Sequence, residues 1–239
     1  GVDHILKDET IPKHIPICRV IDYQMAFSMS NYILMAVLNY HRSFYEFQDA
    51  QSKRRWSQFE FFERPLKVGV LGIGHLGMDA AKKLHHMGFP VFGYSNSQKK
   101  TDFKTYYGDQ FDEFLEQINV LICTVPYTPK THALLNYKLF EKFKSPTYLI
   151  NVSRGNVQVE KDIIKALNKG ILTGAFLDVF EQEPLPKSSP LWSHKKVKIT
   201  PHIASLTYPE ESVKQVLDCY DRLTKGQPLL QQVSREKMY

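Results

Sequence analysis

An apolar segment that runs directly into closely spaced glycines limits the folds open to this chain more than any other feature of its sequence. Residues 66–71 read LKVGVL, and Gly72, Gly74 and Gly77 follow in the pattern G-x-G-x-x-G, ahead of a helical pattern at 78–87. In such a strand, turn and helix, the first glycine permits a tight turn, the second lets a pyrophosphate approach the backbone, and the third lets the helix pack closely. The segment therefore predicts a dinucleotide site, with a glycine-rich turn of another α/β protein as the alternative. Its expected contacts are Gly72, Gly74, His75, Leu76 and Gly77.

The end of the second predicted strand, residues 90–94, indicates which dinucleotide would bind. Residues 95–100 read SNSQKK, and no carboxylate occurs before Asp102. An NAD-specific site places Asp or Glu here to accept hydrogen bonds from the ribose, whereas hydroxyls, an amide and lysines suit a 2′-phosphate. We therefore expect NADP(H) to be preferred over NAD(H), unless the lysines form only a solvated turn beside a permissive pocket. The candidate contacts are Ser95, Asn96, Ser97 and Lys99.

Downstream of the glycines, short apolar runs alternate with helical patterns. This alternation is typical of a parallel sheet with right-handed crossovers. The sequence therefore predicts an α/β fold with a doubly wound parallel sheet of the Rossmann type. The elements expected are strands at residues 119–125, 147–152, 172–177 and 197–200, and a helix at 160–169.

Polar residues follow three successive predicted strands. Arg154, Asp178 and His202 stand at these positions, and the strand ends of a doubly wound sheet line one crevice. Histidine gives and takes a proton near neutrality, and arginine is a two-pronged donor for a carboxylate. Glu183 can orient the imidazole and favour its protonated form. Each residue alone has a structural reading, but together they suit hydride transfer to the carbonyl of an anionic substrate. The neighbouring candidates for cofactor binding are Val125, Pro126, Val152, Ser153, Asp178 and His202.

Composition places the chain among soluble enzymes. Its 239 residues are 43% hydrophobic, and the longest apolar stretch, residues 32–38, is too short to cross a membrane. The net charge of +6 is scattered except at residues 53–55 and 195–198, which we interpret as solvated faces and not as a nucleic-acid site. No signal peptide is evident, and the odd number of widely spaced cysteines indicates neither a disulfide framework nor a metal site. We therefore expect a cytoplasmic protein. The cysteines are Cys18, Cys123 and Cys219.

These motifs resemble the D-isomer-specific 2-hydroxyacid dehydrogenases, and within them the glyoxylate/hydroxypyruvate reductase A group. The resemblance extends over essentially the whole chain. The matching stretches are residues 1–4, 71–77, 125–135, 151–155, 177–186 and 200–207.

The resemblance implies NAD(P)H-dependent reduction of a small 2-oxo acid, of the glyoxylate and hydroxypyruvate class, to the D-2-hydroxy acid. It implies that Arg154 holds the 2-oxo acid and that Glu183 pairs with His202, the acid/base that also contacts the substrate. Asp178 would hold the nicotinamide carboxamide. The reductase A group commonly has arginine where this chain has Asn96, so the resemblance implies a less strict preference for NADP here.

The resemblance also implies two domains. Residues 28–206 would form the dinucleotide-binding domain, and residues 1–27 with 207–239 a remnant of a flavodoxin-like substrate domain whose first strands are missing. The family's first domain begins upstream of the loop at Gly1, so we expect a fragment, with a natural short form as the alternative. In intact relatives, backbone amides around Gly1 and Val2 help to bind the substrate carboxylate.

Two long helices are expected outside the alternating region. One covers residues 29–55, with Ile33 and Val37 in an apolar stripe, and the other covers 209–225. In the resembling family the first region forms a dimer arm from which a tryptophan reaches an active site. We therefore expect a homodimer and treat Trp56 as a candidate substrate contact, with an ordinary core or interface aromatic as the alternative.

Three other functions are alternatives for a chain with these motifs. Formate dehydrogenases share the fold but place glutamine where Glu183 stands, which argues against that activity. A dinucleotide-sensing, oligomerising protein of the corepressor type would keep the same polar residues without significant turnover. A structural fragment that binds cofactor without catalysis is the third, and is favoured only if the missing strands are absent from the natural protein.

Overall fold

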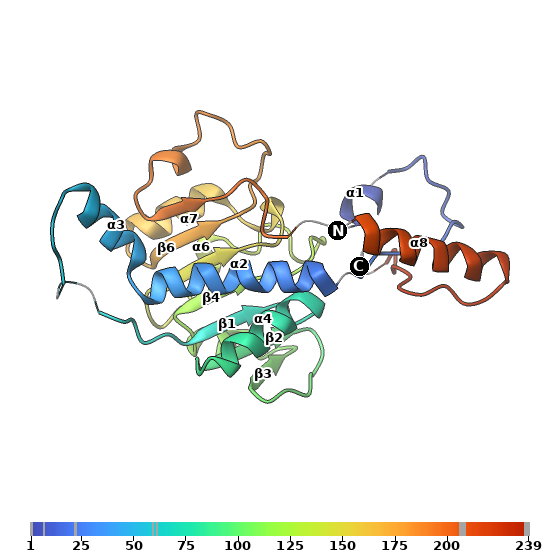
Figure 1. The fold of residues 1–239 in the computed structure, drawn as a ribbon, viewed down its shortest axis with the longest axis horizontal. Helices are drawn as coiled ribbons and strands as arrows, with labels where there is room; N and C mark the ends of the chain where they lie inside the picture. Colours follow the sequence, from blue (N-terminus) through green and yellow to red (C-terminus); the bar gives the residue numbers. More distant parts are fainter. Residues whose placement is uncertain are drawn as a thin grey trace.

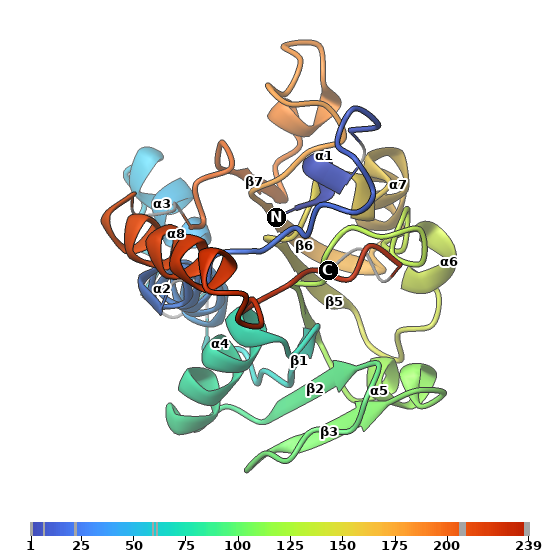
Figure 2. The same cartoon turned by 90° about the vertical axis from the view of Figure 1, so that its right-hand side faces the viewer.

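A single parallel sheet forms the centre of the protein (Figures 1 and 2). The computed structural model describes residues 2–6, 8–21, 23–58, 60, 62–205 and 209–236. Within these residues seven strands pair in the order β3-β2-β1-β4-β5-β6-β7, so the chain order reverses direction between β1 and β4. Ligands of doubly wound sheets bind at such a reversal. The strands are β1 (Val68–Leu71), β2 (Val91–Ser95), β3 (Lys104–Tyr107), β4 (Val120–Cys123), β5 (Thr147–Asn151), β6 (Leu172–Leu177) and β7 (Val197–Ile199).

Helices cover both faces of the sheet. Alternate strand residues point to opposite faces, and so Val70 and Ile122 belong to one buried cluster while Leu71 and Leu121 belong to another. The first cluster includes side chains of α2 and α4, and the second includes side chains of α5, α6 and α7. These helices are α2 (Tyr23–His41), α4 (His75–His86), α5 (Phe111–Glu116), α6 (Tyr137–Phe140) and α7 (Glu160–Asn168).

The predicted Rossmann-type sheet is confirmed. The strands predicted at the glycine turn and downstream of it all form, with ends within two residues of those expected. Strand β3 and helices α5 and α6 were among the elements missed. The pattern of β3 is ambiguous because the strand is short, lies at the sheet edge and has only Tyr106 buried.

The single long helix predicted at 29–55 is wrong. Helix α2 begins earlier, at Tyr23, and ends at His41, and a separate helix α3 covers Phe44–Ser52. Ser43 between them has a left-handed backbone (φ 53°). The guanidinium of Arg64 donates to the carbonyl of Tyr40 and to Ser43 Oγ, and pairs with Glu46 at 2.7 Å. A side chain distant in sequence therefore ends the helix.

The two terminal regions meet beyond the start of α2 (Figure 1). Helices α1 (Asp3–Leu6) and α8 (Pro209–Thr224) lie there, away from the sheet. Cys18 pairs with Gln232 in an isolated antiparallel bridge, and Gln215 of α8 holds the backbone of Ile21 through two hydrogen bonds. Cys18 and Cys219, which are widely spaced in sequence, are neighbours in space and share a hydrogen bond. Burial is the main cause that raises the pKa of the Cys18 thiol, and this hydrogen bond raises it further.

No helix among the described residues is long and apolar enough to span a membrane. Within the same residues, no group of three His, Cys, Asp or Glu side chains is placed to hold a metal ion.

Candidate functional site

Backbone hydrogen bonds between adjacent strand ends bring the predicted site residues to one edge of the sheet. At four strand ends, the residue that follows the strand donates its N–H to the carbonyl of the last residue of the neighbouring strand. These hydrogen bonds keep the strand ends aligned. The bonds run from Thr124 to Leu71 (3.0 Å), Val152 to Cys123 (3.2 Å), Asp178 to Asn151 (3.1 Å) and Thr200 to Leu177 (3.1 Å).

The glycine turn between β1 and α4 has the geometry that its spacing predicts. Gly72 has φ +100°, and a Cβ on Gly77 would lie 2.2 Å from the Gly72 carbonyl oxygen, so only glycine allows the helix this close. A Cβ on Gly74 would meet nothing within 4 Å, so the backbone of Gly74 faces open space. Helix α4 starts directly after it at His75, with free N–H groups that suit an anion. The turn therefore fits a dinucleotide pyrophosphate.

A hollow of about 710 Å³ connects this turn with the residues after β2. Gly74, His75 and Lys99 line it, together with Lys82 and Lys83. Lys83 is paired with Asp79 at 2.6 Å. Ser95 ends β2, and its hydroxyl donates to the carbonyl of Ser97, while Asn96, Ser97 and Lys99 are exposed. Three lysines lie in the lining of this hollow beside apolar side chains of α2 and α4, and their charge suits a dinucleotide that carries an additional phosphate.

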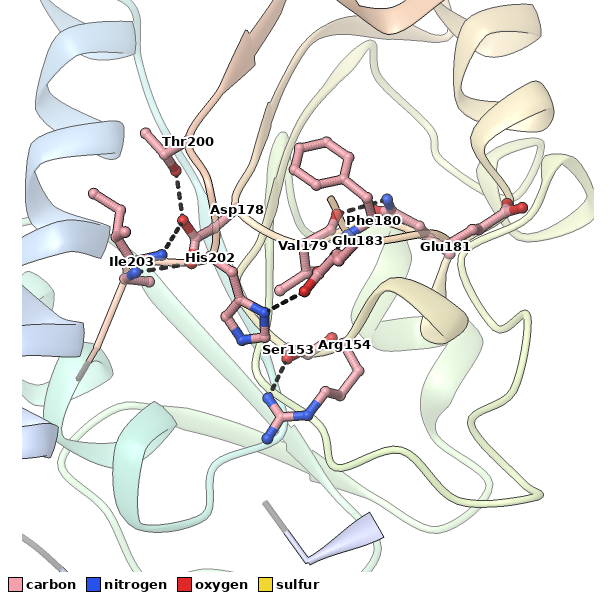
Figure 3. Close-up of polar contacts among 12 residues, drawn as sticks. Ser153, Arg154, Asp178, Val179, Phe180, Glu181, Glu183, Thr200, His202 and Ile203 are labelled. Atoms are coloured by element: carbon pink, nitrogen blue, oxygen red, sulfur yellow. Dashed lines mark hydrogen bonds and ion pairs between the residues drawn. The ribbon is translucent and has the colours of Figure 1, made fainter. Parts of the chain in front are cut away.

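His202 and Glu183 form the central pair of the site (Figure 3). His202 Nδ1 lies 2.7 Å from Glu183 Oε2, and the Phe180 N–H donates to Glu183 Oε1 at 2.9 Å. Both carboxylate oxygens are therefore held. With Nδ1 on the carboxylate, Nε2 is the nitrogen that remains for a ligand, and the imidazole is 44% exposed. An exposed nitrogen on a carboxylate-supported ring can exchange a proton with a bound molecule.

Asp178 holds the loop that carries His202. Its buried carboxylate accepts hydrogen bonds from Ile203 N (2.9 Å), Ala204 N (2.8 Å) and Thr200 Oγ1 (2.5 Å). The carbonyl of Asp178 accepts from His202 N at 2.8 Å. His202 itself has a left-handed backbone (φ 55°), which is uncommon for a residue other than glycine, so these bonds maintain a strained turn.

Arg154 reaches the site because two loops approach unusually closely. A Cβ on Gly155 would lie 1.6 Å from the Phe180 carbonyl oxygen, so glycine is required where the turn after β5 meets the loop leading to Glu183. Arg154 Nη1 donates to the Ser153 carbonyl at 2.7 Å, and in the view of Figure 3 its guanidinium lies below the His202 imidazole. A carboxylate on this guanidinium would bring its neighbouring carbonyl towards the imidazole.

A buried amide pair supports the same turn. Asn151 Oδ1 accepts from the N–H and the hydroxyl of Ser153, and Asn151 Nδ2 donates to Gln158 Oε1 at 2.8 Å. Gln158 Nε2 donates to the Val179 carbonyl at 2.9 Å. The two amides therefore join the loops that carry Arg154 and Glu183.

The remaining predicted contacts fall in two places. Val125 packs against the glycine turn, where its Cγ1 would lie 2.9 Å from a Cβ on Gly72, and Pro126 follows it. Trp56 is 89% exposed and comes after the end of α2, whereas the His202 loop is bonded to Met25 near the start of α2 through Ser205. Because 19 helical residues span about 28 Å, the structure does not bring Trp56 to the site of its own chain.

At the N-terminus, Gly1 lies outside the described residues. The Val2 carbonyl accepts from Leu6 N at 3.0 Å.

Several supporting residues were missed by sequence reasoning. Thr124, whose hydroxyl donates to the Gly72 carbonyl at 2.7 Å, and Asn151 stand at strand ends, where a search for all polar residues would have found them. The roles of Gln158 and Tyr32 depend on partners distant in sequence and leave no local signal.

The sheet order and the glycine turn define a dinucleotide-binding domain of the Rossmann type. The model of the D-isomer specific 2-hydroxyacid dehydrogenase NAD-binding domain matches residues 34–204. The chain belongs to this family.

Similar proteins carry more specific names. A glyoxylate/hydroxypyruvate reductase A of Photorhabdus laumondii is 39% identical over 235 residues, 95% of this chain and 75% of that relative. The solved NADPH-dependent glyoxylate/hydroxypyruvate reductase of Sinorhizobium meliloti, in complex with NADP and sulfate, has a TM-score of 0.96 and 34% identity over 100% of this chain and 78% of that chain. A D-isomer specific 2-hydroxyacid dehydrogenase of Xanthobacter autotrophicus, in complex with NADPH and MES, has a TM-score of 0.95 and 35% identity over 100% of both chains.

Two glycine substitutions separate the folding role of the turn from its binding role. We expect Gly77→Ala to destabilise the protein by about 2 kcal/mol because the new methyl group collides with backbone. Gly74→Ala should leave the melting temperature nearly unchanged, since its methyl group meets no protein atom, yet weaken NADPH binding at least about tenfold where the pyrophosphate approaches. Thermal melts and NADPH fluorescence titration measure both. Normal NADPH affinity in Gly74→Ala would contradict this placement.

Proposed function

We propose that this protein uses NADPH to reduce a small 2-oxo acid, of the glyoxylate and hydroxypyruvate class, to the D-2-hydroxy acid. The observation that carries the proposal is the His202–Glu183 pair, held at 2.7 Å beside Arg154 on the carboxyl edge of a Rossmann sheet. The names of the relatives support the substrate class and the direction of reaction.

Each of the three polar residues has one task in the proposed reaction. Arg154 binds the substrate carboxylate with its planar guanidinium. His202, protonated at Nε2, donates a proton to the carbonyl oxygen as that oxygen becomes an alkoxide. Glu183 holds Nδ1 and stabilises the imidazolium beforehand. When bound, the nicotinamide supplies the hydride that the carbonyl carbon accepts.

The cofactor site is assigned along the same edge. Gly72, Gly74, His75, Leu76 and Gly77 would hold the pyrophosphate, and Ser95, Asn96, Ser97 and Lys99 the ribose 2′-phosphate. We propose a preference for NADP(H), with NAD(H) accepted less well. The basic hollow beside the turn and the NADP-bound relatives support this preference. The nicotinamide end would lie against Val125, Pro126, Val152, Ser153, Asp178 and His202.

The Asp178 carboxylate can still accept a hydrogen bond from the carboxamide of the nicotinamide. A carboxylate has about four acceptor positions, and three are used by Thr200, Ile203 and Ala204. Oδ2 accepts a hydrogen bond from Ala204 N, which leaves it room for an amide N–H of the nicotinamide.

We further propose a cytoplasmic homodimer. The arm formed by α3 and residues 53–58 carries exposed aromatic side chains, including Phe44, Phe47 and Trp56, as a subunit interface would require. Trp56 would then contact the substrate of the partner subunit, because it is distant from the site of its own chain. The dinucleotide-binding domain would comprise residues 28–206, and residues 1–27 with 207–239 would belong to the substrate domain, where Gly1 and Val2 add backbone amides for the substrate carboxylate.

Removal of the proposed acid tests the reaction directly. His202→Gln should lower kcat for glyoxylate and hydroxypyruvate by about 10²- to 10⁴-fold while NADPH still binds, measured as NADPH oxidation at 340 nm and by fluorescence titration. The matched control is His194→Gln, because His194 bonds Asn168 at 3.3 Å outside the site. Near-normal turnover in His202→Gln would refute the mechanism. Tight NADPH binding without turnover in the unmodified protein would favour the corepressor-type alternative.

Charge reversal at Lys99 tests the cofactor assignment. Lys99→Glu should raise the KM for NADPH about tenfold, a loss of about 1.4 kcal/mol, and leave the KM for NADH nearly unchanged, because only NADPH carries the 2′-phosphate. Lys67→Glu makes the same charge change just before β1, at the opposite edge of the sheet. Equal effects on both cofactors would show that Lys99 does not face the 2′-phosphate.

Subunit complementation tests the position of Trp56. Trp56→Ala and His202→Gln protomers each lack one element, but a mixed dimer would contain one complete site, made of His202 from one chain and Trp56 from the other. Co-expression should therefore give NADPH oxidation well above the sum of the two separate variants, approaching about a quarter of the unmodified activity for random pairing. No recovery in a confirmed mixed dimer would refute the placement of Trp56 in the site of the partner subunit.

A further inference from the structure

A chain of hydrogen bonds connects α2 to the loop that carries His202. The hydroxyl of Tyr32, on the buried side of α2, bonds Thr200 Oγ1, and Thr200 Oγ1 lies 2.5 Å from Asp178 Oδ1. Asp178 in turn accepts from the N–H groups of Ile203 and Ala204. Tyr32 is only 8% exposed, so its hydroxyl depends on this partner and not on solvent.

The direction of each bond in this chain follows from the partners. Both oxygens of Asp178 accept backbone N–H bonds, so the carboxylate is an acceptor and Thr200 must donate to it. The single hydroxyl proton of Thr200 is then used, so the Tyr32 hydroxyl is the donor that remains, with Thr200 and the Asp178 carboxylate as its acceptors. Burial is the main cause that raises the pKa of Tyr32 well above its ordinary value, so the phenol keeps the proton that it donates.

We propose that Tyr32 and Thr200 are positioning residues for His202. They hold the Asp178 carboxylate in the orientation that fixes residues 202–204, and this keeps the imidazole on Glu183 despite the left-handed backbone of His202. The inference rests on the proposed function, in which His202 is the proton donor. Because α2 supplies the first hydroxyl, the helix takes part in aligning the acid as well as in packing.

A second tyrosine of the same helix provides a matched control. Tyr40, two turns further along α2, has its hydroxyl 2.9 Å from Thr173 Oγ1 of β6, and its ring stacks on Tyr148. Both tyrosines thus bond a threonine of the sheet region, but only Tyr32 is connected to the His202 loop. Tyr→Phe at either position removes one hydroxyl and keeps the ring.

The test compares Tyr32→Phe with Tyr40→Phe in steady-state reduction of the 2-oxo acid. We expect Tyr32→Phe to lower kcat about tenfold with KM for the 2-oxo acid within about twofold, because binding by Arg154 is unaffected. Tyr40→Phe should keep both values. Thr200→Val should reproduce Tyr32→Phe, and Thr200→Ser, which keeps the hydroxyl, should restore most of kcat.

A pH profile distinguishes positioning from a general loss of structure. Among the described residues, the charged groups facing His202 are Glu183, Asp178 and Arg154, and of these Glu183 is within hydrogen-bond distance of its ring. If the loop loosens, the imidazolium is less stabilised by Glu183, and the fall in reduction rate on the alkaline side moves to lower pH. The midpoint of the His202 imidazole titration, followed by NMR without substrate, should move in the same direction.

The outcomes separate the two proposals. If Tyr32→Phe and Tyr40→Phe have equal kinetics, pH profiles and imidazole titrations, and His202→Gln on its own abolishes turnover, the positioning role is overturned and the proposed function is kept. A loss of kcat without any shift in the pH profile or titration would overturn it too. Absent turnover in the unmodified protein would refute the proposed function, and the NMR titration would still decide whether Tyr32 positions His202.

Discussion

Parallel strand pairing is the constraint on which the rest of this structure depends. The residue after a strand donates its N–H to the end of the neighbouring strand, as Val152 does to the carbonyl of Cys123 and Asp178 to that of Asn151. Residues from distant parts of the chain therefore lie side by side at one edge of the sheet. Strand pairing alone brings them there, and they need not contact one another. The strand order reverses between β1 and β4, and the glycine turn stands at this reversal. The cofactor candidates and the polar candidates consequently share one crevice.

Close contacts between backbone segments at two glycines align the loops of the site with one another. At Gly77 the helix meets the Gly72 carbonyl, and at Gly155 the turn carrying Arg154 meets the Phe180 carbonyl. In both places a side chain would occupy space already filled by backbone, and a close-packed interior has no room to yield. The relative position of Arg154 and Glu183 is therefore determined by main-chain packing, supported by the Asn151–Gln158 amide pair. Flexible side chains alone would hold them far less firmly.

The sequence predicts the parts of this arrangement whose signals are local. The glycine spacing, the apolar runs and the polar residues after them suffice for the sheet, the turn and the edge on which Arg154, Asp178 and His202 meet. The division between α2 and α3 was missed because Arg64 ends the helix from outside it. Tyr32 and Thr200 are 168 residues apart, and a buried tyrosine on an apolar helix face has the pattern of an ordinary core residue. Periodicity reports which face is buried, not which hydroxyl finds a partner there.

The distribution of burial across the site explains how it can be both rigid and reactive. Asp178, Asn151 and Gln158 are almost fully buried, and each has several hydrogen-bond partners, as the cost of burying polar groups requires. His202, which must meet a substrate, is 44% exposed and is attached to this buried layer through its backbone N–H and through Glu183. A buried network tolerates little displacement, because any lost bond leaves a polar group unsatisfied. The exposed imidazole therefore takes its position from groups that solvent does not reach.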